Sequence, residues 1–128
     1  MSRRDARDIA FKLIFSYAFD NEKNEEALEE YTINSDADDK AYILDVYNGV
    51  ILNYDELMNN IKDNAEKFDV NRIYKIDLAI ILLALYEIKF MSSIPFKVSV
   101  DEAVNLANKY STDKSGKYIN GILSKFAR

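Results

Sequence analysis

The segment from residue 72 to residue 90 is apolar on every side of a helical wheel, and this feature constrains the fold more than any other. Its apolar residues are Ile73, Tyr74, Ile76, Leu78, Ala79, Ile80, Ile81, Leu82, Leu83, Leu85, Tyr86 and Ile88. A helix of a globular protein that is apolar all round is covered by other elements on all its sides. We therefore expect a central, buried helix around which the other elements are arranged.

Two carboxylates, Asp77 and Glu87, interrupt this apolar segment. A buried carboxylate needs a partner, and Lys75, Arg72 or the N-terminus of another helix could supply one. For Glu87 we favour a structural pairing. For Asp77 two interpretations stay open: a structural pairing, or a position at the edge of the core where a basic residue of a partner protein docks.

Apolar residues elsewhere recur at three and four positions, which predicts further helices with one buried face. We expect helices from Ala6 to about Asp20, over residues 25–31, from Ile43 to Phe68 as one helix or two, from Ser99, and from about Ser115. The expected break in the long helix is Asn53, because Asn with Glu three residues later is a start signal. Ser99 and Glu102 have the spacing of a capping box.

Composition agrees with this helical interpretation. With 48% hydrophobic residues the chain is too apolar for disorder, and three Gly and one Pro are too few turn residues for a many-stranded β fold. A length of 128 residues is typical of one domain. We expect an all-α fold of about six to seven helices, with residues 1–128 forming a single domain.

The chain has no Cys and no His, which limits its chemistry. Disulfides, thiolate nucleophiles, the commonest general base and the commonest metal ligands are excluded. The one enzyme class left open is a Mg²⁺-dependent hydrolase using Glu26 and Glu29. A solvated acidic face is the favoured interpretation of these residues, so we expect no catalytic residue, no metal and no cofactor.

The net charge of −5 is distributed unevenly along the chain. Residues 21–70 hold four Lys and fourteen Asp or Glu, a net charge of −10, whereas residues 1–20 carry +1 and residues 71–128 carry +4. Such asymmetry can mark an interaction surface. At the N-terminus, Arg3, Arg4 and Arg7 could bind an anion such as a phosphate backbone, or could form a solvated helix start compensated by Asp5 and Asp8.

The last predicted helix has a basic face opposite its buried residues. Within about one third of its circumference lie Lys114, Lys117, Tyr118, Gly121, Lys125 and Arg128. Lysines neutralise phosphates, Tyr118 offers a ring on which an unpaired base can stack, and Gly121 lets another backbone come close. The alternative is a solvated Lys-rich face with Gly121 packed against a neighbouring helix.

The sequence shows no membrane or targeting segment. The most apolar stretch, Leu78 to Tyr86, spans nine residues, whereas a membrane-spanning helix needs roughly 20. The first residues are charged and the apolar residues after them are helically spaced. We expect a cytoplasmic protein that does not associate with a membrane.

Four blocks of residues, in order along the chain, resemble the NusB family of transcription antitermination factors. They are Arg3-Arg4-x-Ala6-Arg7 with Ala10-Phe11-Lys12-Leu13-Ile14-Phe15; Ile76-Asp77-x-Ala79-Ile80-Ile81-x-Leu83-Ala84-Leu85-Tyr86-Glu87-Ile88; Ile94-Pro95-x-Lys97-Val98-x-Val100-x-Glu102-Ala103-Val104-x-Leu106-Ala107; and Ser115-x-Lys117-Tyr118-Ile119-Asn120-Gly121-Ile122-Leu123. Leu78 and Leu82 stand where the family usually has basic residues, and Lys114 where an acidic one is common. The acidic middle is the least diagnostic part.

This resemblance implies two small helical bundles joined around a central helix, and no enzymatic activity. It also implies binding of boxA-type single-stranded RNA from ribosomal RNA operons, together with NusE, a small-subunit ribosomal protein. The complex joins the RNA polymerase antitermination complex and suppresses termination. Some family members form homodimers.

The resemblance also assigns roles to individual residues. It places Arg3, Arg4, Arg7, Lys117 and Tyr118 on RNA, and we add Lys114 and Lys125 from the same helix face. It places Phe15 and Asp77 on the partner protein. The alternative is a helical protein–protein adaptor without direct RNA binding, in which Phe15, Asp77 and the acidic middle form the working surface.

Overall fold

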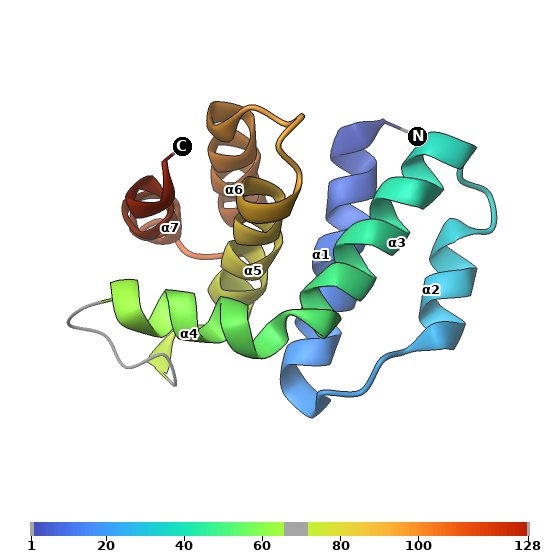
Figure 1. Cartoon of the computed structure of the whole chain (residues 1–128), viewed down its shortest axis with the longest axis horizontal. Coiled ribbons are helices and arrows are strands. Elements are labelled where there is room, and N and C mark those ends of the chain that lie inside the picture. The colour runs from blue at the N-terminus through green and yellow to red at the C-terminus, as the bar shows by residue number, and fades with distance from the viewer. Residues whose placement is uncertain (1, 66–71, 128) are drawn as a thin grey trace.

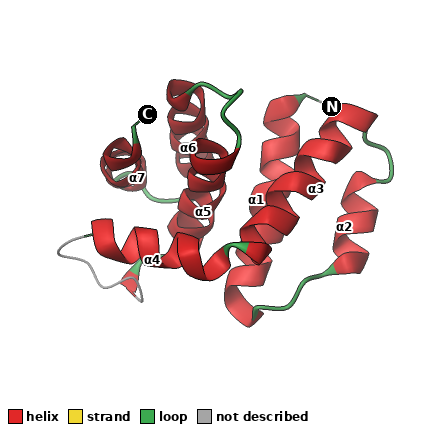
Figure 2. Ribbon diagram, in the orientation of Figure 1, coloured by secondary structure: helices red, strands yellow, loops and turns green. Residues whose placement is uncertain are grey.

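The structure, a computed structural model, describes residues 2–65 and 72–127, and helices dominate both ranges (Figure 1). The helices are α1 (Arg3–Asp20), α2 (Glu25–Thr32), α3 (Ala37–Leu52), α4 (Tyr54–Asn64), α5 (Lys75–Phe90), α6 (Phe96–Tyr110) and α7 (Ser115–Leu123), and a 3₁₀ turn follows over Ser124–Phe126. No strand occurs in the described ranges (Figure 2). The expected all-α fold is confirmed. Phe68 and Arg128, which belong to the predicted helices, lie outside the described residues.

Helix α5 lies at the centre of the molecule, as its all-round apolar sequence predicts. Every residue from Asp77 to Ile88 is buried, and α1, α3, α4, α6 and α7 all pack against this helix. Figure 1 shows α1, α2 and α3 on one side of α5, with α6 and α7 on the other. This is the expected arrangement of two small bundles around a central helix.

Glu87 of α5 is the polar centre of this packing. Its carboxylate pairs with Arg7 of α1 and accepts hydrogen bonds from the hydroxyls of Tyr42 in α3 and Ser99 in α6. The structural interpretation of Glu87 is confirmed, although its cation is neither Arg72 nor Lys75. Burial lowers the pKa of Arg7, but its hydrogen bonds and attraction to Glu87 outweigh this and raise it.

Helices α3 and α5 approach closely at Gly49. A Cβ atom at this position would overlap the ring of Tyr86, so glycine is required for the contact. The Tyr86 hydroxyl donates to Asp45 Oδ1 at 2.6 Å. Burial and this interaction with Asp45 raise the pKa of Tyr86 to about 12. At this contact the two helices pack closely, and the protonated Tyr86 of α5 is hydrogen-bonded to Asp45 of α3.

The predicted break at Asn53 is confirmed, but its expected capping role is wrong. Helix α3 ends at Leu52 and α4 begins at Tyr54. The Asn53 side chain makes no hydrogen bond to the start of α4; its Nδ2 donates to the carbonyl oxygen of Gly49 at 2.8 Å. Asn53 therefore closes α3 by satisfying a carbonyl of the last turn.

The predicted capping box at Ser99 and Glu102 is also wrong. Helix α6 begins at Phe96, directly after Pro95, whose fixed φ suits the start of a helix. Ser99 therefore lies inside the helix, where its hydroxyl donates to Glu87 at 2.8 Å. A capping box does occur at the start of α1, where Ser2 and Asp5 each accept a backbone N–H of the other at 3.1 Å.

Candidate nucleic-acid interface

The N-cap residue of α7, the outer face of this helix and the turn after it carry the cations that the helical wheel predicts. Lys114, Lys117 and Lys125 are all exposed. Lys125 donates from Nζ to the carbonyl oxygen of Asn64 at 2.7 Å, which holds this side chain near the end of α4. Within residues 2–65 and 72–127, neither Lys114 nor Lys117 forms a salt bridge. Their charge is available to an anion from outside the molecule.

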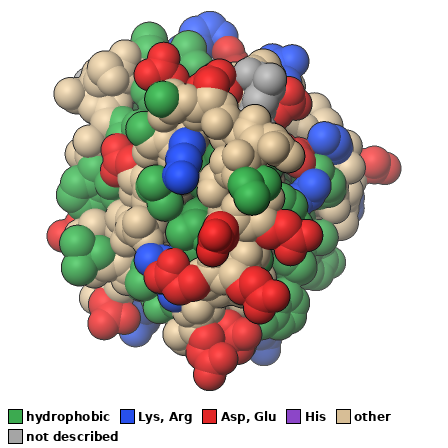
Figure 3. All heavy atoms as spheres, turned by 90° about the vertical axis from the view of Figure 1, so that its right-hand side faces the viewer, with side chains coloured by type: hydrophobic (Ala, Val, Ile, Leu, Met, Phe, Trp, Pro, Cys, Tyr) green, Lys and Arg blue, Asp and Glu red, His purple; other side chains and the backbone are tan. Residues whose placement is uncertain are grey.

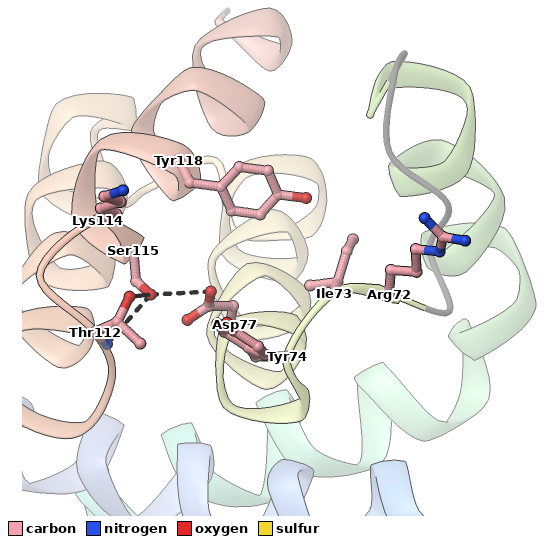
Figure 4. Close-up of a pocket in the computed structure, with 8 residues that line it drawn as sticks. All are labelled: Arg72, Ile73, Tyr74, Asp77, Thr112, Lys114, Ser115 and Tyr118. Carbon is pink, nitrogen blue, oxygen red and sulfur yellow. Dashed lines mark hydrogen bonds between the residues drawn. The ribbon is translucent and has the colours of Figure 1, made fainter.

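Tyr118 lies beside these cations at a pocket of about 220 Å³ (Figure 4). The pocket lies between α7 and the start of α5, and its lining residues are Arg72, Ile73, Tyr74, Asp77, Thr112, Lys114, Ser115 and Tyr118. The lining is mostly apolar, and the ring of Tyr118 extends across it from α7. Burial, reinforced by the charge of Asp77, raises the pKa of Tyr118 and keeps its hydroxyl protonated.

Asp77 forms the polar wall of the same pocket. Its carboxylate accepts hydrogen bonds from the Ser111 hydroxyl at 2.5 Å and from the Ser115 hydroxyl at 3.0 Å. Ser111 follows α6 as its C-cap and Ser115 is the first residue of α7, so Asp77 is bonded to both ends of the connection and orients the start of the basic helix. The cations considered as partners of Asp77 do not supply the pairing: Lys75 donates instead to the carbonyl oxygen of Ala18 at 3.3 Å.

The three N-terminal arginines differ in what holds them. Arg4 makes two hydrogen bonds to Glu102 of α6, at 2.9 and 3.1 Å, yet its side chain remains 71% exposed. Arg3 lies over the ring of Tyr42, 4.4 Å from its centroid, and 3.8 Å from Asp39. Both side chains therefore keep positive charge at the surface, with 41% of Arg3 and 71% of Arg4 exposed.

Arg7 is 6% exposed, and its guanidinium is bound by Glu87. We therefore assign Arg7 to the core and leave it out of the RNA-contacting set. Among the described residues, neither Asp5 nor Asp8 forms an ion pair with Arg3, Arg4 or Arg7. Asp5 caps α1, and Asp8 binds Lys12, Lys109 and the Tyr110 hydroxyl.

Phe15 lines a second hollow, of about 500 Å³, beside the pocket of Tyr118. Its other lining residues are Phe19, Tyr74, Lys75, Ile76, Tyr110, Ser111 and Thr112. Because Tyr74 and Thr112 line both hollows, the hollows are neighbours. Phe15 and Asp77, both predicted to contact a partner protein, thus lie at adjoining depressions of one surface.

Phe19 and Tyr74 are two exposed aromatic residues on this surface that the sequence patterns do not single out. Phe19 is 61% exposed and packs edge-on against Phe15, with ring centroids 5.0 Å apart. Its signal was the aromatic series Phe11, Phe15 and Phe19 at intervals of four residues. The apolar pattern of residues 72–90 predicts that Tyr74 is part of the buried helix, but it precedes α5 as its N-cap and is 64% exposed.

Comparison with known proteins agrees with this arrangement. The sequence model of the NusB family matches residues 4–128. The chain belongs to the NusB family. The transcription antitermination protein NusB of Acetivibrio thermocellus is 42% identical over 132 residues, covering 100% of this chain and 90% of that protein. T. maritima NusB, a solved structure, matches with a TM-score of 0.91 and 33% identity, covering 99% of this chain and 91% of that one.

A solved complex of the antitermination factors NusB and NusE with double-stranded RNA has the same fold. Its matching chain gives a TM-score of 0.86 at 23% identity, covering 97% of this chain and 94% of that chain. The structure also places the three residues that the resemblance marks as departures, Leu78, Leu82 and Lys114. Leu78 and Leu82 are buried in α5, whereas Lys114 is exposed beside Tyr118.

Neither a metal site nor a membrane helix is found in the described part of this NusB-family chain. In residues 2–65 and 72–127, no group of three carboxylates could hold a metal ion. Glu26 is exposed, and Glu29 lies at a groove between α2 and α3. No helix of the same ranges is both long and apolar enough to cross a bilayer.

Proposed function

We propose that this NusB-family chain is a transcription antitermination factor that binds boxA-type single-stranded RNA of ribosomal RNA operons together with NusE. The observation that carries this proposal is the exposed pair Lys114 and Lys117 beside Tyr118 at a mostly apolar pocket. The antitermination function of the relative from Acetivibrio thermocellus supports this role, and the complex of NusB and NusE with double-stranded RNA supports the choice of NusE and of RNA as partners. The single-stranded form of the RNA is proposed from the exposed stacking surface of Tyr118.

The RNA interface combines charge with stacking. Lys114 and Lys117 neutralise phosphates, and Lys125 extends the basic face along the turn after α7. The ring of Tyr118 gives an unpaired base a stacking surface, which a base inside a duplex could not reach. Arg3 and Arg4 add a second cationic contact at the start of α1. Sequence preference then comes from the bases that fit the pocket, and affinity comes mainly from phosphate contacts.

NusE is proposed to bind the adjoining aromatic surface. Phe15, Phe19 and Tyr74 present apolar area that this chain does not cover fully, and aromatic residues are common at the centre of protein interfaces. Asp77, in the neighbouring pocket, lies where RNA and NusE surfaces meet. The bound complex acts by positioning RNA on the RNA polymerase antitermination complex in the cytoplasm, so we assign this chain no enzymatic activity.

Titration of a labelled boxA oligonucleotide, with and without NusE, tests this function. We expect tighter binding than to a shuffled RNA, and a logarithmic affinity that falls with log salt by about 0.7 for each phosphate contact. Binding that ignores both RNA sequence and salt would contradict the proposal. If the chain binds NusE, and substitution of Arg3, Arg4 or Lys117 does not change RNA binding, the chain is instead the protein–protein adaptor.

A further inference from the structure

A groove of about 350 Å³ between α2 and α3 belongs to neither surface described above. Its lining residues are Glu25, Leu28, Glu29, Thr32, Ile33, Lys40 and Leu44. Leu28 and Thr32 are buried and Leu44 is half-buried, so they form the bottom of the groove. The Thr32 hydroxyl donates to the carbonyl oxygen of Leu28 at 2.7 Å, so this hydroxyl is already satisfied within α2, and Leu28 and Leu44 supply the apolar contacts of the groove.

The rim of the groove is charged, and its two sides differ. Glu25 and Glu29 of α2 are exposed along one side, and Lys40 of α3 lies on the other. Glu25 Oε1 also pairs with Lys23 Nζ at 2.8 Å, but the Glu25 side chain remains 72% exposed. Ile33, directly after α2, is 70% exposed and adds an apolar contact at the end of that helix. The groove therefore offers apolar contacts below, two carboxylates on one edge and a single cation on the opposite edge.

The surroundings of the groove are strongly acidic. The described part of the acidic middle, residues 21–65, holds twelve Asp or Glu and three Lys. Acidic side chains gather on the lower part of the face shown in Figure 3, which views the molecule from the side of α2. Such a field attracts cationic ligands and repels RNA and anionic lipids. The ligand that fits is a basic protein segment.

We propose that the α2–α3 groove docks a basic amphipathic helix of a partner protein. An apolar side chain of that helix contacts Leu28 and Leu44, and Lys or Arg residues along one edge face Glu25 and Glu29. An acidic residue on the other edge faces Lys40, which fixes the direction of the helix. This is the helix-in-groove mode of peptide recognition, with charge complementarity setting the partner class.

This docking is compatible with the proposed RNA binding, because the two surfaces are far apart. In Figure 1, α2 and α7 lie at opposite ends of the molecule. The chain can therefore hold RNA on α7 and a basic partner on α2 at the same time. The proposal does not depend on RNA binding, so each can fail alone.

The test uses a fluorescein-labelled synthetic helix with Leu at every third and fourth position and Lys elsewhere, and a matched peptide in which Glu replaces Lys. Binding to the full chain is followed by fluorescence anisotropy, and contacts are mapped from backbone amide shifts in NMR spectra. We expect the Lys peptide to bind, with shifts concentrated at Leu28, Ile33 and Leu44, and the Glu peptide to bind at least tenfold more weakly.

Matched variants on α2 separate the groove from general charge attraction. Glu25→Gln/Glu29→Gln removes the rim carboxylates, and Glu26→Gln/Glu30→Gln removes the same charge from the same helix outside the groove lining. We expect about a tenfold loss for the first pair and less than about a twofold loss for the second. Equal losses, or amide shifts centred on α7, would overturn the proposal. So would a concentration-dependent dimer that the first variant abolishes, since a second copy would then occupy the groove.

Discussion

Arg7 of α1 and Glu87 of α5 form a buried, two-point ion pair across 80 residues of sequence. The Arg7 Nε lies 2.9 Å from Glu87 Oε2, and its Nη2 lies 3.3 Å from Oε1. Because Tyr42 and Ser99 donate to the same carboxylate, the pair joins α1, α3, α5 and α6. Arg7, the most buried of the three N-terminal arginines, therefore helps to hold these four helices together.

Replacing Arg7 with Met should destabilise the fold without a direct effect on RNA contacts. The Glu87 carboxylate would stay buried without its cation, and breaking such a pair costs about 3–5 kcal/mol. Urea denaturation measures the loss. Arg4→Met, which breaks an exposed pair with Glu102, is the control and should change stability little. A stable Arg7→Met variant with weakened RNA affinity would return Arg7 to the RNA-contacting set.

Replacing Tyr118 with Ala should weaken RNA binding while the chain stays folded. Loss of one stacked base costs roughly 1–3 kcal/mol, equivalent to about 5- to 150-fold in affinity. Fluorescence anisotropy with a boxA oligonucleotide reports the affinity, and circular dichroism reports the helices. Tyr31→Ala removes an exposed tyrosine from α2, far from α7, and should leave the affinity unchanged. Equal affinity of wild type and Tyr118→Ala would exclude stacking on this ring.

Removing Lys114 and Lys117 from the basic face should reduce the salt dependence of RNA binding. If Lys114 and Lys117 each contact a phosphate, Lys114→Ala/Lys117→Ala should lower the magnitude of the slope by about 1.4. The measurement is affinity at several salt concentrations. Lys23→Ala/Lys40→Ala removes the same charge from the acidic side of the molecule. An identical change of slope in both variants would mean that net charge, and not the α7 face, governs binding.

Replacing Gly121 with Ala should raise stability and weaken RNA binding at the same time. Among the described residues, no atom lies within 4 Å of a Cβ atom built at Gly121, so packing against a neighbouring helix does not explain this glycine. Ala is favoured over Gly inside a helix by up to about 1 kcal/mol. Thermal melts and RNA titration of one variant measure both effects. Unchanged RNA affinity would show that no ligand backbone approaches α7 here.

Gly49→Ala is the contrasting glycine substitution. Its new methyl group would collide with the Tyr86 ring at the contact between α3 and α5, so stability should fall. The same melting experiment measures this change. Stability equal to that of wild type would mean that the two helices separate at little cost.

Low pH should weaken the ion pair between Arg4 of α1 and Glu102 of α6. Hydrogen bonding and attraction from Arg4 lower the pKa of Glu102 below its usual value of 4.5, although burial acts in the opposite direction. A lowered carboxyl pKa stabilises the fold above the unfolded value, and this contribution is lost as pH falls through the folded value. The stability difference between wild type and Glu102→Gln should therefore shrink as the pH is lowered below 4.5. A stability difference that does not change with pH would mean that it comes from the packing of Glu102 and not from its ion pair.

Most of the helices could be predicted from the sequence, because helical periodicity is a local property of the chain. The all-round apolar pattern of residues 72–90 identified the central helix, and the basic face of Lys114, Lys117 and Tyr118 followed from angular spacing alone. Local chemistry was less decisive where long-range contacts compete. Ser99 has capping-box spacing, but the buried Glu87 takes its hydroxyl and Pro95 sets the earlier helix start.

The sequence by itself thus determined the helical class, the buried centre and the basic outer face of α7. Only the tertiary structure decided which charges meet. Arg7 and Glu87 lie on helices that are distant in sequence, and their pairing buries Arg7 in the core. Arg3 and Arg4 remain at the surface. It also placed Asp77 and Tyr118 at one pocket. Periodicity shows which face of a helix is apolar, whereas the neighbour that covers each face is set by the packing of all the helices together.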